Sequence, residues 1–327
     1  MSDNRQITRH VLADGDVSVA ILSLGCITQD WQVPLDGRRV PVVLGYRHPQ
    51  DYLNNPHYLG IIAGRVANRI SGAGFTFDGQ RYVLPVNDRP NHLHGGPAGI
   101  YTQNWGVEPD GAGAVRLHLE SPSGDQGYPG WVSFEVTISL QGHTLTYDMR
   151  ADTDCPTPVN LAQHSYYNLM GGGAVLDHQL KILGDHFTPT DAAMVPTGKV
   201  QSLTGQDFDL RQAKTVHRAD PCHHGLDMNY VLSGAPSDTG VMLTAPNGLQ
   251  LTMMTDQPCL QLYTGGALAP AGTPLAGQFH APFAGLCLEP QQYPNALNTS
   301  GFPSIVISPD QPYRQKLQVR IAPDGAP

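Results

Sequence analysis

The sequence predicts a mostly β protein, a large antiparallel β-sandwich with few short helices. Glycine supplies 36 and proline 28 of the 327 residues, which is typical of many short strands joined by tight turns. Apolar residues recur at period two in several runs, whereas helical periodicity is poor nearly everywhere. Strands without intervening helices cannot easily form a parallel sheet, because parallel pairing needs long crossover connections. The expected sheets are therefore antiparallel and packed face to face.

The strands are justified by alternation and by turn dipeptides that separate alternating runs. The clearest hairpin has apolar residues at every second position over 132–140 and again over 145–149, on either side of Gln141-Gly142. In chain order we expect a strand pair within 17–33 broken at Gly25, a buried strand at 40–44, a hairpin around Asp78-Gly79, the hairpin 132–149, a short helix within 211–218, a hairpin around Asn247-Gly248, and late strands at 305–307 and 317–321.

Bulk properties limit the classes of function. The net charge is −9 and no basic run occurs, which argues against nucleic acid and anionic membranes as partners. The polar residues 1–6 lead into no apolar segment, and no apolar run approaches the roughly 18 residues of a membrane span. The five scattered cysteines contain no Cys-x-x-Cys pair and indicate reduced thiols. We expect a cytoplasmic protein, a monomer or a homodimer, with residues 1–327 forming a single β-sandwich domain.

Two residues are candidates for proton transfer. His164 lies in the run 160–169 among small, aromatic and amide residues, with no charged side chain in that run. Histidine titrates nearest neutral pH and suits proton transfer, although a histidine held by the backbone has the same surroundings. Glu289 follows an apolar strand and precedes the uncharged polar run 291–295. Burial would raise its pKa and make it a usable base, and a solvated carboxylate at a strand end is the alternative.

The heptad 64–70 places two arginines and an asparagine among apolar residues. If it is a strand, Arg65 and Arg69 share one face and Asn68 lies on the other. A fixed guanidinium donates several hydrogen bonds to sugar oxygens or to a carboxylate, whereas two solvated surface arginines are the alternative.

The run 91–96 contains His92 and His94, which would face the same way on a strand, as in a metal site. Cysteine and carboxylate ligands are lacking nearby, so we expect no metal, and we take His94 as a second polar group of a pocket. The pair Gly95-Gly96 would let backbone approach a ligand closely.

The remaining candidates are Asp227 and Gln261. Asp227 alone is typical of a turn, whereas Gln261 and Tyr263 share a strand face and suit a polar inner surface. No Gly-x-Ser-x-Gly, Walker loop or dinucleotide glycine fingerprint is present, which disfavours serine hydrolases and nucleotide cofactors.

Taken together, six segments in order resemble the aldose 1-epimerases, also called galactose mutarotases. They span about residues 58–300 and comprise the runs 58–70, 91–96 with Trp105 downstream, 164–169, 224–227, 261–265 and 287–295. The resemblance implies a galactose mutarotase-like supersandwich forming one catalytic domain, with a sugar bound in a cleft across one sheet. It implies neither cofactor nor metal.

The resemblance also implies roles for seven residues. Glu289 matches the general base that takes the proton of the C1 hydroxyl, and His164 matches the general acid that protonates the ring oxygen. His94 matches a second histidine that positions the ring oxygen. The residues that match holders of sugar hydroxyls are Asn68, Arg69, Asp227 and Gln261.

The expected activity is interconversion of the α and β anomers of free hexoses, galactose and glucose, by ring opening and closure. One alternative is an epimerase of hexose 6-phosphates, which needs further cations, with Arg65, Arg81 and Arg89 as candidates. The other is a non-catalytic sugar-binding or regulatory protein on the same fold, which has no need of an acid–base pair. Departures from the family pattern at Tyr167, Leu226 and Pro290 leave the preferred sugar open.

Overall fold

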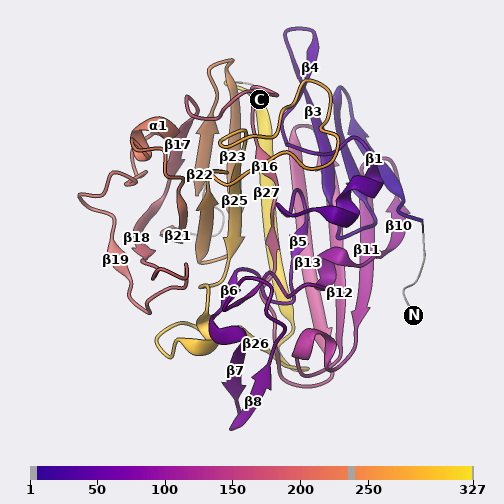
Figure 1. The fold of residues 1–327 in the computed structure, drawn as a ribbon. Helices are drawn as coiled ribbons and strands as arrows, with labels where there is room; N and C mark the ends of the chain where they lie inside the picture. Colours follow the sequence, from indigo (N-terminus) through magenta and orange to yellow (C-terminus); the bar gives the residue numbers. More distant parts are fainter. Residues whose placement is uncertain (1–5, 235–239, 326–327) are drawn as a thin grey trace.

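The computed structural model describes residues 6–234 and 240–325 and is dominated by β-strands (Figure 1). Every strand pair in the described ranges is antiparallel, as the sequence predicts. Two large sheets share one hydrophobic core, to which Phe134 and Leu317 contribute from one sheet and Leu260 and Leu288 from the other. The predicted antiparallel sandwich is confirmed. Of the polar N-terminal run, residues 1–5 lie outside the described part.

The larger sheet has nine strands, which follow one another across Figure 1 from the magenta to the orange segments. Along its central strands, alternate residues such as Val132, Phe134 and Val136 are buried against the core. In spatial order the strands are β10 (Gly106–Asp110), β11 (Ala114–Ser121), β12 (Val132–Gln141), β13 (Thr144–Thr153), β27 (Tyr313–Pro323), β23 (Leu249–Thr255), β22 (Val241–Thr244), β17 (Gln179–Ile182) and β20 (Lys214–Thr215).

The second large sheet has six strands and is shorter. Alternation along its strands sends leucines such as Leu286 and Leu288 into the core and leaves the other face to polar residues. The order is β16 (Tyr166–Tyr167), β25 (Leu286–Gln291), β24 (Cys259–Tyr263), β21 (Asp227–Leu232), β18 (Gly184–Thr188) and β19 (Gln201–Ser202).

Smaller elements complete the described chain. The four-stranded sheet comprises β1 (Arg9–Asp14), β2 (Val17–Leu22), β3 (Thr28–Leu35) and β4 (Arg38–Pro41). Two-stranded pairs are β14 (Thr157–Pro158) with β26 (Val306–Ile307), β15 (Ala162–Gln163) with β5 (Ile62–Ala63), β6 (Arg69–Ile70) with β9 (His92–Leu93), and β7 (Gly74–Phe77) with β8 (Gln80–Val83). The helical segments are α1 (Val216–Ala219) and the 3-10 turns η1 (Pro49–Asn54), η2 (Ser71–Ala73), η3 (Ile100–Thr102), η4 (Asp125–Gly127) and η5 (Ala296–Asn298).

The three predicted hairpins are confirmed as β7–β8, β12–β13 and β22–β23. The predicted helix within 211–218 is largely wrong. Arg211 is held in a turn by Asp209, and Lys214 and Thr215 pair with β17, so only Val216–Ala219 is helical. The predicted strand at 40–44 is also shorter, since β4 ends at Pro41 and Val43 makes only an isolated bridge to Tyr167.

All five cysteines are free, in agreement with the predicted thiols. Among the described helices none is long and apolar enough to cross a membrane.

Candidate active site

The seven predicted site residues line one cleft of about 370 Å³. It opens on the polar face of the six-stranded sheet and is completed by loops from the first third of the chain. Its lining comprises Pro56, His57, Tyr58, Asn68, Arg69, Asp88, Leu93, His94, His164, Tyr166, Asp227, Gln261, Tyr263, Ala267 and Glu289.

Strand register builds the base of the cleft. β21, β24 and β25 pair so that Asn229, Gln261 and Glu289 lie side by side in one row across the sheet. Asp227 and Tyr263 lie opposite each other in the next row on the same face. The intervening apolar residues point into the core. These strands are buried on both sides. Period-two alternation places their polar side chains together on the face that is turned away from the core.

His164 forms one wall of the cleft, in the link between β15 and β16. Its backbone amide donates to the carbonyl oxygen of Ile61 at 2.9 Å, and its own carbonyl accepts from the amide of Gly60 at 2.9 Å. The imidazole packs between aromatic rings, with centroids 6.0 Å from Tyr58 and 5.4 Å from Tyr166. The ring is therefore fixed by its backbone and by its neighbours.

His164 and Glu289 meet in the cleft, with 3.6 Å between Nε2 and Oε1. Only 4% of His164 and 2% of Glu289 is exposed. Burial lowers the pKa of His164 to about 4. Burial, and then the charge of Asp227, raises the pKa of Glu289 well above its ordinary value. Both groups therefore favour their neutral forms, and Oε2 of Glu289 is buried without a hydrogen-bond partner among the described residues.

A local turn fixes His94. The backbone amide of Asn68 donates to Nδ1 of His94 at 3.3 Å, and the amide of His94 donates back to the carbonyl oxygen of Asn68 at 3.2 Å. Because Nδ1 accepts a hydrogen bond, the proton of the neutral ring is on Nε2. Burial, followed by the proximity of His164, lowers the pKa of His94 well below its ordinary value. His94 therefore presents an N–H donor to the cleft.

Arg69 is held between two carboxylates at the edge of the cleft. Its Nε lies 2.7 Å from Oδ2 of Asp88, and its Nη1 lies 3.8 Å from Oδ2 of Asp227. The other oxygen of Asp227 accepts a hydrogen bond from the side-chain amide of Gln261. Burial raises the pKa of Asp227, and the guanidinium of Arg69 opposes that rise. The arrangement offers both donors and acceptors to a neutral, hydroxyl-rich ligand.

His94, His164 and Glu289 place three donor atoms within 4.8 Å of one another, the only such group found in residues 6–234 and 240–325. A metal ligand must supply an unprotonated ring nitrogen. In His94 that nitrogen is Nδ1, which the amide of Asn68 already occupies. The tautomer of His94 therefore does not fit a metal centre, and the expected absence of a metal stays a prediction.

Residues 64–70 do not form one strand, so the condition under which Arg65 and Arg69 would share a face is not met. Only Arg69–Ile70 is a strand, because Asn68 adopts a φ of 64° and breaks the extended backbone. Arg65 and Arg69 therefore do not share a face. Arg65 is buried and its guanidinium donates to four backbone carbonyl oxygens, those of Ser121, Pro122, Pro129 and Gly130.

The interpretation of 92–96 needs two corrections. β9 ends at Leu93 and His94 has a φ of 52°, so His92 faces elsewhere and its ring bonds a backbone carbonyl and the hydroxyl of Tyr128. A Cβ on Gly95 would lie 1.8 Å from the carbonyl oxygen of Gly64. The glycine is therefore needed for a close approach within the protein itself.

Sequence reasoning gave no role to several residues of the cleft. Tyr58 packs against His94, with ring centroids 4.8 Å apart, from a backbone with a φ of 57°. A left-handed non-glycine residue leaves no pattern in the sequence. Asp88 lies in an Asn-Asp-Arg-Pro run that is typical of a turn. Cys287 does not line the cleft but contacts His164, with 3.5 Å between Sγ and Nδ1. It had a signal, because it lies two residues before Glu289 on one strand and therefore on the same face.

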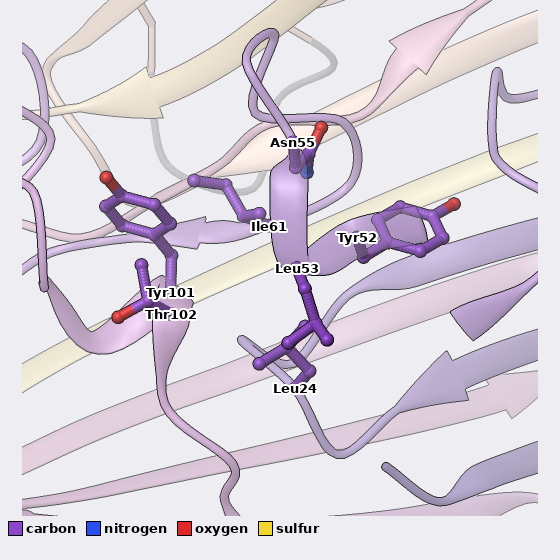
Figure 2. A pocket seen from close by; sticks show the side chains of 7 residues that line it. All are labelled: Leu24, Tyr52, Leu53, Asn55, Ile61, Tyr101 and Thr102. Atoms are coloured by element: carbon purple, nitrogen blue, oxygen red, sulfur yellow. The ribbon is translucent and has the colours of Figure 1, made fainter. Parts of the chain in front are cut away.

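A second cavity has a volume of about 70 Å³, and Figure 2 shows the side chains that line it. It is lined mainly by Leu24, Leu53, Ile61 and Tyr101, and the Tyr101 ring also packs edge-on against Tyr58, with centroids 5.4 Å apart. Its lining contains neither carboxylate nor imidazole. The acid–base chemistry therefore belongs to the larger cleft.

Comparison with known proteins agrees with this geometry. Residues 8–320 match the family model described as aldose 1-epimerase. The chain is 36% identical to the galactose mutarotase of Rattus norvegicus over 314 residues, covering 94% of this chain and 92% of the relative. It is 33% identical to the aldose 1-epimerase of Escherichia coli over 298 residues, covering 87% and 86%.

Solved structures are similar over nearly their whole length. An aldose epimerase homologue from C. elegans superposes with a TM-score of 0.93 at 26% identity, covering 97% of this chain and 99% of the other. A galactose 1-epimerase from Lactobacillus acidophilus superposes with a TM-score of 0.83 at 25% identity, covering 99% and 96%.

Proposed function

The chain belongs to the aldose 1-epimerase family and is an isomerase of that class, and we propose that its substrates are free hexoses, galactose and glucose among them. The observation that carries the proposal is the contact between His164 and Glu289 inside a polar cleft. Mutarotation needs one base and one acid on either side of the hemiacetal carbon, and a well-placed group of each kind contributes on the order of a hundredfold or more.

Glu289 is the proposed base and His164 the proposed acid. Glu289 takes the proton of the C1 hydroxyl while Nε2–H of His164 protonates the ring oxygen, the bond between C1 and the ring oxygen breaks, and a free aldehyde forms. Rotation about the C1–C2 bond presents the other face of the aldehyde. On closure the ring oxygen returns its proton to His164, and Glu289 returns one to the C1 oxygen.

The buried pair works with one shared proton. Burial places that proton on Glu289 in the free cleft, since it lowers the pKa of His164 and raises that of Glu289. When the shared proton moves from Glu289 to His164, Glu289 becomes the carboxylate base and His164 becomes the imidazolium acid. No net charge enters the buried cleft, and Oε2 of Glu289 has no hydrogen-bond partner in the described part of the chain that would compete with the sugar.

The other predicted residues are proposed to hold the sugar. His94 donates Nε2–H toward the ring oxygen and its neighbouring hydroxyls. The side-chain oxygen of Asn68 accepts from the amide of Arg69 at 2.8 Å, which leaves its NH₂ group for a hydroxyl. Arg69 supplies donors, Asp227 accepts, and Gln261 is held by Asp227 on one side and Gln291 on the other. Hydroxyl recognition requires such directional groups.

The hexose 6-phosphate alternative is not favoured. Arg69 is the only arginine or lysine among the residues that line the cleft, and Asp88 and Asp227 already flank it. Arg65 is occupied by backbone carbonyl oxygens, and neither Arg81 nor Arg89 lines the cleft. We further propose that residues 1–327 act as one catalytic domain in the cytoplasm, without nucleic-acid or membrane partners.

Polarimetry of freshly dissolved α-D-galactose and α-D-glucose tests the proposal, with Glu289→Gln and His164→Asn as variants. We expect the wild type to accelerate the approach to equilibrium rotation, and each variant to lose at least about a hundredfold in rate. A wild-type rate equal to buffer on both sugars would refute the substrate assignment. Full activity in Glu289→Gln would refute the assignment of the base.

A further inference from the structure

A network of amide side chains links the cleft to the interior of the six-stranded sheet. It consists of Gln261, Gln291 and Asn229, on the adjacent strands β24, β25 and β21, with Asp227 at one end and Thr188 at the other. The three amide residues are buried. Gln261 and Asp227 line the cleft, whereas Gln291 does not. The amide network therefore joins a proposed sugar-binding residue to residues that lie outside the cleft.

The hydrogen bonds of the amide network all run outward from Gln291. Its NH₂ group donates to the side-chain oxygens of Gln261 and Asn229, each at 3.4 Å. The NH₂ group of Gln261 donates in turn to Oδ1 of Asp227, and that of Asn229 donates to the hydroxyl of Thr188 at 3.2 Å. The side-chain oxygen of Gln261 is thus occupied by a donor from outside the cleft, and its NH₂ group is directed to Asp227.

We propose that Gln291 is a positioning residue that fixes the side-chain amide of Gln261, with its oxygen on Gln291 and its NH₂ group shared between Asp227 and the sugar. The inference deepens the proposed function and rests on it, because Gln261 is there one of the residues that hold the sugar. Gln291 does not line the cleft and acts only through Gln261.

Asp227 alone holds Gln261 less firmly than the two partners together. Its carboxylate lines the cleft, Oδ2 lies 3.8 Å from Nη1 of Arg69, and it is itself a proposed acceptor for the sugar. A sugar hydroxyl therefore competes with Gln261 for the same oxygens. The hydrogen bond from Gln291 lies outside this competition and is kept while the sugar binds. A reversed Gln261 amide would face NH₂ against NH₂ at Gln291 and oxygen against oxygen at Asp227.

The contribution of Gln291 to sugar binding should be modest. Its two hydrogen bonds are longer than the usual 2.7–3.2 Å between nitrogen and oxygen. The loss of one neutral hydrogen bond that orients a binding group corresponds to about a fivefold change in affinity. Because Gln291 is remote from the proton-transfer groups, the change should fall on KM and leave kcat nearly constant.

A double-mutant cycle tests the positioning role. The variants are Gln291→Met, which keeps the length of the side chain but has no donor, Gln261→Leu, and the two combined. Gln291→Asn, whose amide is too short to reach both acceptors, is a second variant should the methionine variant not fold. Gln29→Met is the matched control, because Gln29 is a buried glutamine on β3 that donates to backbone carbonyls and does not line the cleft.

We expect Gln291→Met to raise KM for galactose about fivefold with kcat changed less than about twofold, and Gln29→Met to change neither. Gln261→Leu should raise KM further. The double variant should be no worse than Gln261→Leu alone, because Gln291 acts through Gln261. A second readout needs no sugar. The side-chain NH₂ signal of Gln261 in ¹H–¹⁵N spectra, assigned by its loss in Gln261→Leu, should shift and exchange faster with solvent in Gln291→Met.

Full addition of the two KM changes in the double variant would overturn the positioning role, as would an unchanged Gln261 signal in Gln291→Met or an equal rise of KM in Gln29→Met. The proposed function fails separately. If the wild type accelerates neither galactose nor glucose, the substrate assignment falls, and the Gln261 signal still decides the role of Gln291.

Discussion

The backbone amide of Asn68 donates to Nδ1 of His94, with 3.3 Å between the two nitrogens. The bond makes the side chain a donor through Nε2 and excludes it as a simple metal ligand. His92, two residues earlier in the same run, is instead bonded to Tyr128 at 2.9 Å. Two neighbouring histidines that look equivalent in the sequence therefore have different hydrogen-bond partners and different positions relative to the cleft.

His94→Leu should lower kcat/KM for galactose by about a hundredfold, because a donor near the ring oxygen is lost while the shape of the cleft is kept. His92→Phe is the matched variant and should instead lower stability by about 2 kcal/mol, since it leaves buried partners unsatisfied. Polarimetric rates and urea denaturation distinguish the two. Equal loss of rate in both variants would contradict the separation.

The pH dependence of kcat/KM should be bell-shaped, because the pair His164–Glu289 must carry one proton. Below about pH 4, which is the pKa to which burial lowers His164, a second proton blocks the base. Above the raised pKa of Glu289 the shared proton is lost and the acid is missing. Rates from pH 3.5 to 10, corrected for the buffer-catalysed reaction, check this. Activity that rises without limit toward alkaline pH would contradict the shared proton.

Asp88→Asn should raise KM about three- to fivefold with little change in kcat, since the ion pair that orients Arg69 is partly exposed and contributes at most about 1 kcal/mol. The carboxylate lies 2.7 Å from the guanidinium and is one-third exposed. Glu108→Gln, which removes a surface partner of Arg116, is the control and should change neither constant. A large fall of kcat in Asp88→Asn would give Asp88 a part in the chemistry.

Arg65→Lys should reduce the free energy of unfolding by about 3 kcal/mol, because one ammonium cannot reach the four carbonyl oxygens that the guanidinium satisfies. The exposed Arg150→Lys should cost less than about 0.5 kcal/mol. Urea denaturation measures both. Folded Arg65→Lys should retain its KM for galactose. A raised KM would show that Arg65 contributes to sugar binding.

His280→Phe should make the protein less sensitive to acid. His280 is fully buried, neither ring nitrogen has a partner among the described residues, and burial lowers its pKa to about 4. The unfolded chain takes up a proton below the ordinary pKa of 6.5 while the folded chain does not, so stability present above pH 6.5 is lost as the pH falls toward 4.

Between pH 6.5 and 5 that loss amounts to roughly 2 kcal/mol for one histidine. Urea denaturation at pH 7 and pH 5 should therefore show a smaller difference for His280→Phe than for wild type. An identical difference in the two proteins would mean that the pKa of His280 is not lowered in the folded protein.

The sequence predicted the β-class and the long hairpins because alternation and turn dipeptides are local signals. The run 132–149 shows this, since its apolar residues became the buried face of β12 and β13. The full order of strands was not predictable, because the pairs β13–β27, β23–β27 and β17–β22 join strands that are far apart in the chain. The short pairs such as β6–β9 were missed for the same reason, since two-residue strands carry no period.

Within the cleft, alternation predicted the shared face of Gln261 and Tyr263, and the family resemblance brought together His164 and Glu289. The failures share one cause. Asn68, His94 and Tyr58 all have positive φ values, and non-glycine residues in that conformation look ordinary in a sequence. An extended segment 64–70 would place Arg65 on the same face as Arg69, and the positive φ of Asn68 prevents this.

β27 lies between β13 and β23 in the middle of the nine-stranded sheet, although it is the last strand in the chain. During synthesis the edges of β13 and β23 both exist long before their common partner. Each exposes unpaired backbone groups, which are templates for association with other chains. The strands of the opposite wall, the six-stranded sheet, all precede residue 292 in the chain, so the core still lacks β27 when that wall is complete. The centre of the nine-stranded sheet is therefore completed last. Chains that end before Tyr313 should aggregate and should form no cleft.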